Sequence, residues 1–206
     1  AKLIGIRHLC VNTLEFEDPN YLRNPFNRCY FCKSELYDRL IALAPTLGVD
    51  VLVNGANADD RGDHRPGMQA AAEFAVRSPL LELDITKAEV RELARQWDLP
   101  VWDKPASPCL SSRIAPGVEA TPERAARIEA AEAYLKKLGY RDFRVRLHEG
   151  ELARIEVPSD AIVQLSEPEL RAELVRYLLT LGFRYVTLDM QGFRSGNLNE
   201  LIPLKI

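Results

Sequence analysis

Three of the four cysteines in this 206-residue chain stand in motifs suited to binding a metal. Cys29 and Cys32 form a C-x-x-C pair, and Cys109 lies far downstream in the Pro- and Ser-rich stretch 104–114. Three thiolates are one short of the four that a closed structural zinc site or an ordinary iron–sulfur centre uses. A centre held by three protein ligands keeps one position open, and chemistry can take place there.

The surroundings of the C-x-x-C pair favour ionised thiols. The pair leads into an amphipathic stretch over 34–47, so both thiolates are expected in the first turn of a helix, where the N–H groups and the dipole favour anions. Taken alone, the pair is equally typical of half a zinc site or of a redox dithiol. Cys10 stands in an apolar run and is interpreted as a buried core thiol.

The composition limits the class of protein. With 47% hydrophobic and 28% charged residues, the chain can bury the core of one large or two small domains. Its formal net charge of −3 argues against a general nucleic-acid binder. The sequence has no apolar run long enough to cross a bilayer and no signal peptide, so a cytoplasmic protein without membrane contact is predicted, whose cysteines are ligands or reactive thiols.

Strands and helices alternate in the first part of the chain. Strands are predicted over 8–13, over 49–53 and near residue 81. Helices are predicted over 34–47, over 69–76 and from the capping sequence at 86–89 onward. This alternation predicts an α/β fold with a doubly wound parallel sheet. The first residues have the pattern of a helix end followed by a strand, which is typical of the middle of an α/β unit. We therefore expect a preceding segment to be missing.

The pattern changes after residue 117. A helix is predicted from 121 to 138, a hairpin over 143–157 that turns at Glu149-Gly150, a helix over 168–181 and a strand over 183–190. This order is typical of a small α+β module. We therefore predict two domains, 1–116 and 117–206.

Three motifs resemble those of the LarE family, in this order and at these intervals: RCYFCK at 28–33, NGANADDRGDHRPG at 54–67 and KPASPCLSSRI at 104–114. This family comprises sulfur transferases of the PP-loop ATP pyrophosphatase superfamily that serve synthesis of the nickel-pincer cofactor of lactate racemase. The resemblance extends over essentially the whole chain. Family members open with a strand and an S-G-G-x-D-S phosphate loop. No such sequence is present, so the chain as printed is expected to be incomplete for ATP hydrolysis.

The resemblance implies a reaction. ATP adenylylates a carboxylate of a pyridinium-3,5-biscarboxylic acid mononucleotide, and sulfur delivery then gives the thiocarboxylate. In one branch of the family a single cysteine gives up its sulfur and becomes dehydroalanine, and in the other three cysteines hold a 4Fe-4S cluster. Cys29, Cys32 and Cys109 resemble the cluster branch, in which a donor supplies sulfide and the cluster carries it. Cys109 as a sacrificial sulfur source remains the alternative.

A nucleotide site is predicted after the strand at 49–53, because ligands bind beyond the carboxyl ends of parallel strands. Gly55 permits close approach of a nucleotide, and Asn57 belongs to the same loop. Asp59 and Asp60 could hold Mg²⁺ on ATP or brace the loop. A capped turn with solvated acids is the alternative.

Two arginine motifs are predicted to bind phosphate. The resemblance assigns Ser112 and Arg113, next to Cys109, to phosphate near the reacting centre, although Arg113 could instead pair with an acid such as Asp103. Arg144 and Arg146 alternate along a strand and so share a face, which suits the phosphate of a mononucleotide substrate. A solvated strand face is the alternative.

Several acids are candidates for catalysis or metal binding. Glu132 is a candidate catalytic group, and Glu156 and Asp160 are candidate ligands for a metal near a subunit contact of a homo-oligomer. The alternative is that such side chains face water.

Two other functions fit the sequence. A tRNA thiolase of the same superfamily can also use three cysteines and a cluster, but the acidic balance disfavours an RNA substrate. A metal-binding or assembly module without enzymatic activity is the third hypothesis, because the phosphate loop is missing.

Overall fold

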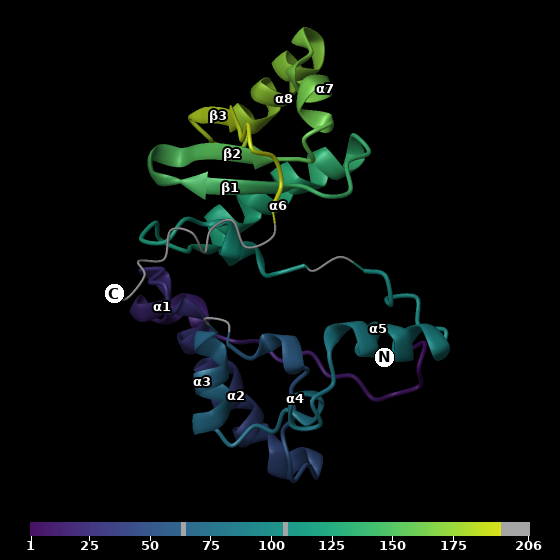
Figure 1. The fold of residues 1–206 in the computed structure, drawn as a ribbon. Coiled ribbons are helices and arrows are strands. Elements are labelled where there is room, and N and C mark those ends of the chain that lie inside the picture. Colours follow the sequence, from purple (N-terminus) through teal and green to yellow (C-terminus); the bar gives the residue numbers. More distant parts are fainter. Residues whose placement is uncertain (63–64, 105–106, 195–206) are drawn as a thin grey trace. The chain divides into compact units, whose positions relative to one another are not determined.

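The computed structural model describes residues 1–62, 65–104 and 107–194 (Figure 1). The chain divides into two compact units. The first comprises Ala1–Tyr21 and Asn27–Ala106, and the second comprises Leu22–Phe26 and Ser107–Ile206. This division lies upstream of the boundary predicted at residue 116. The segment Leu22–Phe26 belongs to the second unit although the chain on both sides of it belongs to the first.

Helices dominate the chain up to residue 104. They are α1 (Pro19–Leu22), α2 (Arg28–Leu47), α3 (Pro66–Glu73), α4 (Pro79–Glu82) and α5 (Lys87–Gln96), with 3-10 turns at Glu15–Glu17 and Ala58–Asp60. Helix α2 ends at Gly48, whose left-handed conformation (φ 65°) lets its N–H reach the carbonyls of Ala44 and Pro45. Helix α5 begins at the predicted capping box of Thr86 and Glu89, which is confirmed.

Helices α2 and α3 form the core of the first unit. Four buried residues make up its centre, and partly buried apolar side chains, including Leu36 and Leu40 of the amphipathic stretch 34–47, pack around them. These four residues are Tyr37, Ala70, Ala71 and Val76. Small side chains on α3 allow this helix to approach α2 closely. A Cβ atom on Gly67 would meet Cγ of Lys33 at 3.0 Å.

The doubly wound parallel sheet is not shown among the described residues of the first unit. Residues 8–13 form no strand. Within 49–53 only Val53 pairs, through an isolated parallel bridge to Arg77. A parallel strand needs a neighbour to satisfy its backbone groups, and here that pairing is limited to the two hydrogen bonds that join Leu52 and Asn54 to Arg77 (2.9 Å each).

The strand predicted near residue 81 is wrong, because this segment is the short helix α4. Pro79 occupies the first turn, where its missing N–H costs nothing. The carboxylate of Glu82 accepts a hydrogen bond from the N–H of Ser78 (3.0 Å) and pairs with Arg77. These contacts hold the pKa of Glu82 at about 2.

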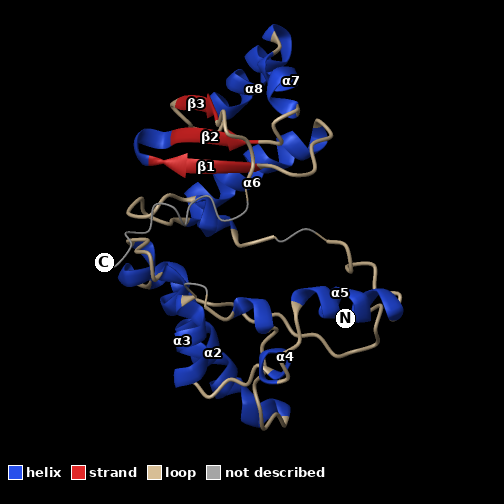
Figure 2. Ribbon diagram, in the orientation of Figure 1, coloured by secondary structure: helices blue, strands red, loops and turns tan. Residues whose placement is uncertain are grey.

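The second unit is an α+β module, as predicted. Its sheet has the order β1 (Arg144–His148), β2 (Leu152–Glu156), β3 (Tyr185–Leu188), with β1 and β2 antiparallel and β2 and β3 parallel. Its helices are α6 (Pro122–Lys137), α7 (Ala161–Ser166) and α8 (Pro168–Thr180), and 3-10 turns cover Leu110–Arg113 and Glu149–Glu151. Figure 2 shows that all three strands belong to this unit.

The sheet of the second unit has one apolar and one polar face. Val145 and Leu147 of β1 and Ala153 and Ile155 of β2 are fully or almost fully buried, as are Ile128, Ala131 and Leu135 of α6 and Leu178 of α8. Because side chains alternate along a strand, Arg144, Arg146 and His148 point to the opposite face. The apolar face supplies the core, and the polar face carries charged side chains, of which Arg146 and Glu156 are buried.

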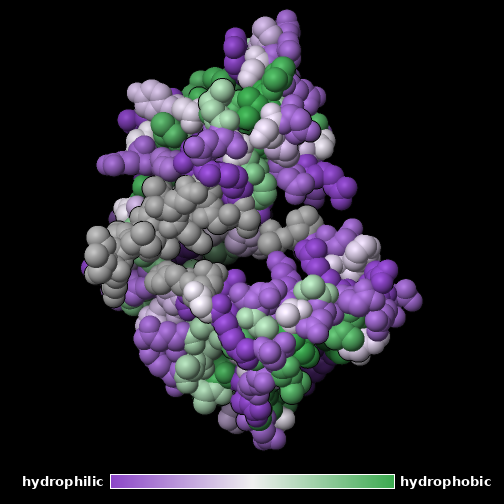
Figure 3. Space-filling model, in the orientation of Figure 1, coloured by the Kyte–Doolittle hydropathy of each residue, from purple (hydrophilic) through white to green (hydrophobic). Residues whose placement is uncertain are grey.

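Apolar side chains are also exposed, above all in the first unit, where they form part of the green surface in Figure 3. Val51 and Val53 of the predicted strand are 55% and 62% exposed. Among the described residues no helix has both the length and the apolar character needed to cross a membrane.

Candidate functional site

Cys29 and Cys32 lie at the N-terminal end of α2. The helix begins at Arg28, earlier than predicted, so Cys29 stands in its first turn and Cys32 starts the second. Cys29 is exposed, Cys32 is partly buried, and both are free thiols. The side chain of Asn27 makes no capping hydrogen bond to the first turn. Cys29 thus lies in the first turn, as predicted, whereas Cys32 lies one turn further along, and ionisation of the pair remains a prediction.

A cavity of about 410 Å³ lies beside Cys29 in the first unit. Its volume is within the range of small-molecule sites. Lys33 of α2 and Arg65 add positive charge to its wall, and Asp60 adds a carboxylate. The remaining lining residues are Tyr37, Asn54, Gly55, Ala56, Pro66, Gly67 and Met68. The C-x-x-C helix and the predicted nucleotide loop thus share one cavity.

The acids of the nucleotide loop hold the loop together. The side chain of Asn57 accepts a hydrogen bond from the N–H of Asp59 (3.1 Å), and Asp60 accepts one from the N–H of Asn57 (3.0 Å). Asp60 also pairs with Arg65 (2.8 Å), and Asp59 accepts from the N–H of Lys87 (3.0 Å). These contacts favour the bracing role. Magnesium binding by Asp59 remains a prediction.

Cys109 of the second unit is an exposed free thiol at the start of the turn Leu110–Arg113. Its carbonyl oxygen accepts three hydrogen bonds, from the N–H (3.0 Å) and hydroxyl (2.6 Å) of Ser112 and from Nη1 of Arg113 (2.9 Å). The backbone that presents the thiol is therefore held firmly while the thiol itself faces solvent.

Arg113 is buried, with 4% of its side chain exposed, and it pairs with Glu132. Its Nε and Nη2 donate to the two carboxylate oxygens of Glu132 at 3.0 and 3.2 Å. Glu132 also accepts from the N–H of Val145 on β1 (3.2 Å). Arg113 does pair with an acid, but the acid is Glu132 of α6. Both candidate residues thus connect the Cys109 turn to the sheet.

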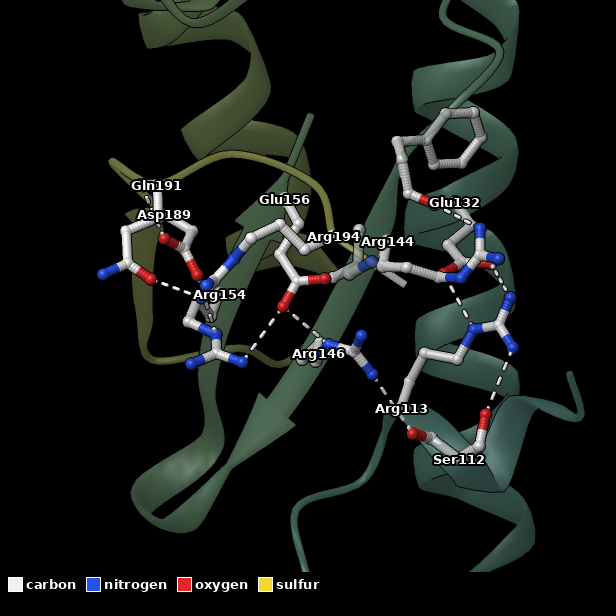
Figure 4. A network of polar contacts seen from close by, with 12 residues as sticks. Ser112, Arg113, Glu132, Arg144, Arg146, Arg154, Glu156, Asp189, Gln191 and Arg194 are labelled. Carbon is white, nitrogen blue, oxygen red and sulfur yellow. Dashed lines mark hydrogen bonds and ion pairs between the residues drawn. The ribbon is translucent and has the colours of Figure 1, made fainter. Parts of the chain in front are cut away.

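A second network covers the polar face of the sheet (Figure 4). Oε1 of Glu156, which is fully buried, accepts from Nε of Arg146 (2.7 Å) and from Nη2 of Arg154 (3.0 Å). Nε of Arg154 lies 3.7 Å from the carboxylate of Asp189. Nη1 of Arg146 donates to the carbonyl of Ser112 (3.3 Å), next to the Cys109 turn.

Arg144 and Arg146 share a face, as predicted, but differ in environment. The guanidinium of Arg144 lies 5.0 Å from the centre of the Phe193 ring. Burial and the nearby Arg113 lower the pKa of Arg144, and the nearby Glu132 opposes this shift. Arg146 is 8% exposed and held by Glu156. Nη1 of Arg144 also donates to the carbonyl oxygen of Phe143 (2.6 Å), so both arginines are held by neighbouring groups.

The predicted metal ligands belong to several different elements of the two units. Within the described ranges, no group of three or more His, Cys, Asp or Glu side chains is placed to hold a metal ion. Glu156 pairs with the guanidiniums of Arg146 and Arg154, which favours a role in positioning these arginines. Asp160 lies at the start of α7, beside a different cavity of about 370 Å³. Cys29 and Cys32 belong to the first unit and Cys109 to the second, so the three-thiolate centre remains a prediction.

Comparison with known proteins decides the family. No family model matches the chain. The chain is 39% identical over 191 residues to the pyridinium-3,5-bisthiocarboxylic acid mononucleotide synthase of Lactiplantibacillus plantarum, a match that covers 92% of the chain and 68% of that protein. The chain belongs to the LarE family. The chain is also similar to two uncharacterized proteins. It is 52% identical over 202 residues to one from Synechocystis, in a match that covers 98% of the chain and 75% of that protein. It is 30% identical over 193 residues to one from Methanocaldococcus jannaschii, in a match that covers 94% of the chain and 74% of that protein.

Sequence reasoning missed several residues of this LarE-family chain. Lys33 and Arg65 line the cavity, and Arg154 and Asp189 belong to the polar network. Arg154 could have been found from the sequence, because the predicted hairpin places it on the strand that pairs with Arg146. The structure has these two arginines directly opposite each other. The position of Lys33 in the cavity wall could not be predicted from the sequence, because it depends on how α3 packs against α2.

Proposed function

We propose that this LarE-family chain belongs to an ATP-dependent sulfur transferase that converts the carboxylates of pyridinium-3,5-biscarboxylic acid mononucleotide to thiocarboxylates. The product would serve synthesis of the nickel-pincer cofactor of lactate racemase. The 39% identity to the bisthiocarboxylic acid mononucleotide synthase, over 92% of the chain, is the observation on which this proposal rests. We place the reaction in the cytoplasm, where thiols stay reduced, and propose that the enzyme is a homo-oligomer.

We assign ATP to the first unit, as the nucleotide-binding layer of a PP-loop fold. The cavity beside Gly55 supports this assignment, because Lys33 and Arg65 supply positive charge for phosphate groups. In the reaction a substrate carboxylate attacks the α-phosphorus of ATP with Mg²⁺ bound, and pyrophosphate leaves. Sulfide then attacks the acyl carbon, and AMP leaves with the former carboxylate oxygen.

The cysteines fit an iron–sulfur cluster by their chemistry. All three are free thiols, two of them are exposed, and the C-x-x-C pair lies at the N-terminal end of α2. We propose that Cys29, Cys32 and Cys109 hold a 4Fe-4S cluster. When bound, the cluster would supply an iron that carries sulfide from a donor. Ser112 and Arg113 orient the backbone of Cys109 for this role.

The proposed function is tested by assaying sulfur transfer with the anaerobically purified protein. The protein is incubated with ATP, Mg²⁺, sulfide and the biscarboxylic acid mononucleotide, and the product is identified by mass spectrometry. Exchange of oxygen for sulfur together with release of AMP is expected. Parallel reactions contain unmodified transfer RNA in place of the mononucleotide. Thiolation of the RNA alone would contradict the proposal and identify a tRNA thiolase.

Cys10 is an exposed thiol and not the buried core thiol that the sequence predicts. Cys109→Ala and Cys10→Ala therefore form a matched pair of variants, because both cysteines are exposed free thiols. The Cys109 variant should lose sulfur transfer and the Cys10 variant should keep it. Conversion of Cys109 to dehydroalanine after one turnover would instead assign the sulfur to this cysteine.

A further inference from the structure

The cavity of about 370 Å³ in the second unit has no part in the proposed function. Its lining comes from two segments, the loop between α6 and β1 at 138–142 and the segment from β2 into α7 at 158–164. Both lie at the end of the sheet where β1 begins and β2 ends, since Arg144 is paired with Glu156 (Figure 1). The volume is within the range of small-molecule sites.

The backbone around this cavity is fixed by hydrogen bonds of its own. Gly139, whose left-handed conformation (φ 96°) ends α6, donates its N–H to the carbonyl oxygen of Lys136 (3.0 Å). At the start of α7, the N–H of Ala161 donates to the carbonyl oxygen of Pro158 (2.9 Å). The walls are therefore formed before a ligand arrives, and little backbone has to be ordered when it binds.

The polar side chains that line the cavity are exposed and are not paired with one another. Across the part of the chain that the structure describes, none of them makes a hydrogen bond or an ion pair through its side chain. They are Arg141, Asp142, Asp160 and Gln164. Because these groups face solvent, a ligand can reach them. One guanidinium and two carboxylates thus line a single hollow without neutralising each other.

These charges discriminate between classes of ligand. An anion such as phosphate would meet two carboxylates beside one guanidinium, and a simple amine would leave the guanidinium without a partner. A zwitterion satisfies both, because its carboxylate can accept paired hydrogen bonds from Arg141 while its ammonium donates to Asp142 or Asp160. The described residues include no group of three His, Cys, Asp or Glu side chains placed to hold a metal ion, so the two aspartates suit an ammonium better.

The rest of the lining limits the side chain of the ligand. It offers apolar or small groups, from Leu138, Gly139, Tyr140, Pro158 and Ala161. An aliphatic side chain loses contact with water against such groups, and this burial is favourable. A charged side chain would find no further partner among them.

We propose that this cavity binds a free α-amino acid with an aliphatic side chain. Arg141 binds the carboxylate of the amino acid, and Asp142 and Asp160 bind its ammonium group. The site lies outside the proposed sulfur-transfer reaction and does not depend on it. It also replaces the metal predicted for Asp160 with an organic cation.

Binding of L-leucine, measured by calorimetry, tests the site. Two analogues keep the aliphatic part and one charge each, since isopentylamine lacks the carboxylate and isocaproate lacks the ammonium. Each should bind more weakly than leucine by roughly fivefold to tenfold, between the value of an exposed ion pair and that of a hydrogen bond to a charged group.

Variants assign each charge of leucine to its partner. Arg141→Gln should weaken leucine binding by the same factor and should not weaken isopentylamine binding, because this analogue has no carboxylate. The double variant Asp142→Asn with Asp160→Asn should weaken leucine binding and leave isocaproate binding undiminished.

Matched controls change exposed residues of the same types elsewhere. Arg171→Gln alters an exposed arginine of α8, and Asp38→Asn with Asp50→Asn alters two exposed aspartates of the first unit. Both should keep the affinity for leucine. If the controls lose as much affinity as the cavity variants, the inference is overturned.

Three further results would overturn it. One is the absence of leucine binding in a titration able to detect a Kd of about 1 mM. Another is equal weakening of leucine and isopentylamine in a folded Arg141→Gln protein. The third is binding of Mn²⁺ at Asp142 and Asp160 in place of leucine, which would return Asp160 to its predicted role as a metal ligand.

A measurement on the unaltered protein covers the case in which a cavity variant does not fold. The backbone amide signals of Gly139 and Ala161, one from each wall, are followed by nuclear magnetic resonance during the leucine titration. Both should shift, and by more than with either analogue at the same concentration. If leucine binds and neither signal moves, it binds elsewhere and this cavity is not the site.

Discussion

Arg113 and Cys109 are joined by a hydrogen bond of 2.9 Å from Nη1 of the arginine to the carbonyl oxygen of the cysteine. The same guanidinium binds both carboxylate oxygens of Glu132 on α6. A single buried side chain therefore fixes the backbone of an exposed thiol to the scaffold of the second unit. This geometry gives Arg113 a structural task whether or not a phosphate also approaches it.

Replacing Arg113 with Ala should destabilise the second unit by about 3–5 kcal/mol, because Glu132, whose side chain is only 14% exposed, would be left as a charge without its partner. Urea unfolding followed by circular dichroism measures this change, and faster reaction of Cys109 with a maleimide should accompany it. The control is Arg95→Ala, which removes an exposed i,i+3 pair with Glu92 and should leave the unfolding curve unchanged. A stable Arg113→Ala protein with an unchanged Cys109 rate would contradict this role.

Removing any one of Cys29, Cys32 and Cys109 should abolish retention of iron, because two thiolates protect a cubane poorly against oxidation and loss. Iron per chain and visible absorbance after anaerobic purification are the measurements. Cys10→Ala, which removes another exposed thiol, should bind iron like the unaltered protein. If iron content survives all three changes, the three-ligand centre is wrong.

Local signals in the sequence were sufficient for much of the second unit. The alternation in 143–157 and the turn at Glu149-Gly150 predict the hairpin because its partners are adjacent in sequence, and the capping box at Thr86 likewise predicts the start of α5. The strands of the first unit could not be predicted from such local signals. Pairing of parallel strands depends on distant segments, and the apolar run at Leu80 fits a helix turn once Pro79 and Glu82 cap it.

The ion pairs among the candidate site residues could not be predicted from the sequence. Arg113, Glu132, Arg146 and Glu156 were all identified as candidate residues, whereas their ion pairs were not. Which carboxylate meets which guanidinium depends on the packing of α6 and the register of the strands, and charge patterns along a sequence do not encode that.

Asn24→Ala should destabilise the second unit by about 1–3 kcal/mol, the cost of leaving buried polar groups without partners. Asn24 is 2% exposed, and its side-chain amide donates to the carbonyls of Ala115 (2.8 Å) and Val118 (2.9 Å). Its positive φ of 51° adds strain for Ala. Hydrogen exchange of residues 110–120 should accelerate. Asn20→Ala, at an exposed position of α1, is the control, and equal effects of the two changes would refute this anchoring role.

The stability of the second unit should fall as the pH decreases from about 7 to 5.5, and His148 should cause part of this fall. Burial, followed by the charges of Arg154 and Arg146, lowers the pKa of His148 below its ordinary value of 6.5. In this range the unfolded chain therefore binds a proton that the folded chain does not, so acidification favours unfolding. Above pH 7 the imidazole is neutral in both states and contributes nothing.

His148→Gln should reduce the pH dependence of the urea midpoint in this window, and His8→Gln, which changes an exposed histidine of the first unit, should not. The lowered pKa values of Glu35, Glu82 and Glu151 act in the same direction but only at lower pH, because unfolded glutamates titrate near 4.5. The window above 5.5 therefore isolates the histidine. If the urea midpoint has the same pH dependence in the His148 variant and in the unaltered protein, burial does not lower the pKa of His148 and this prediction is wrong.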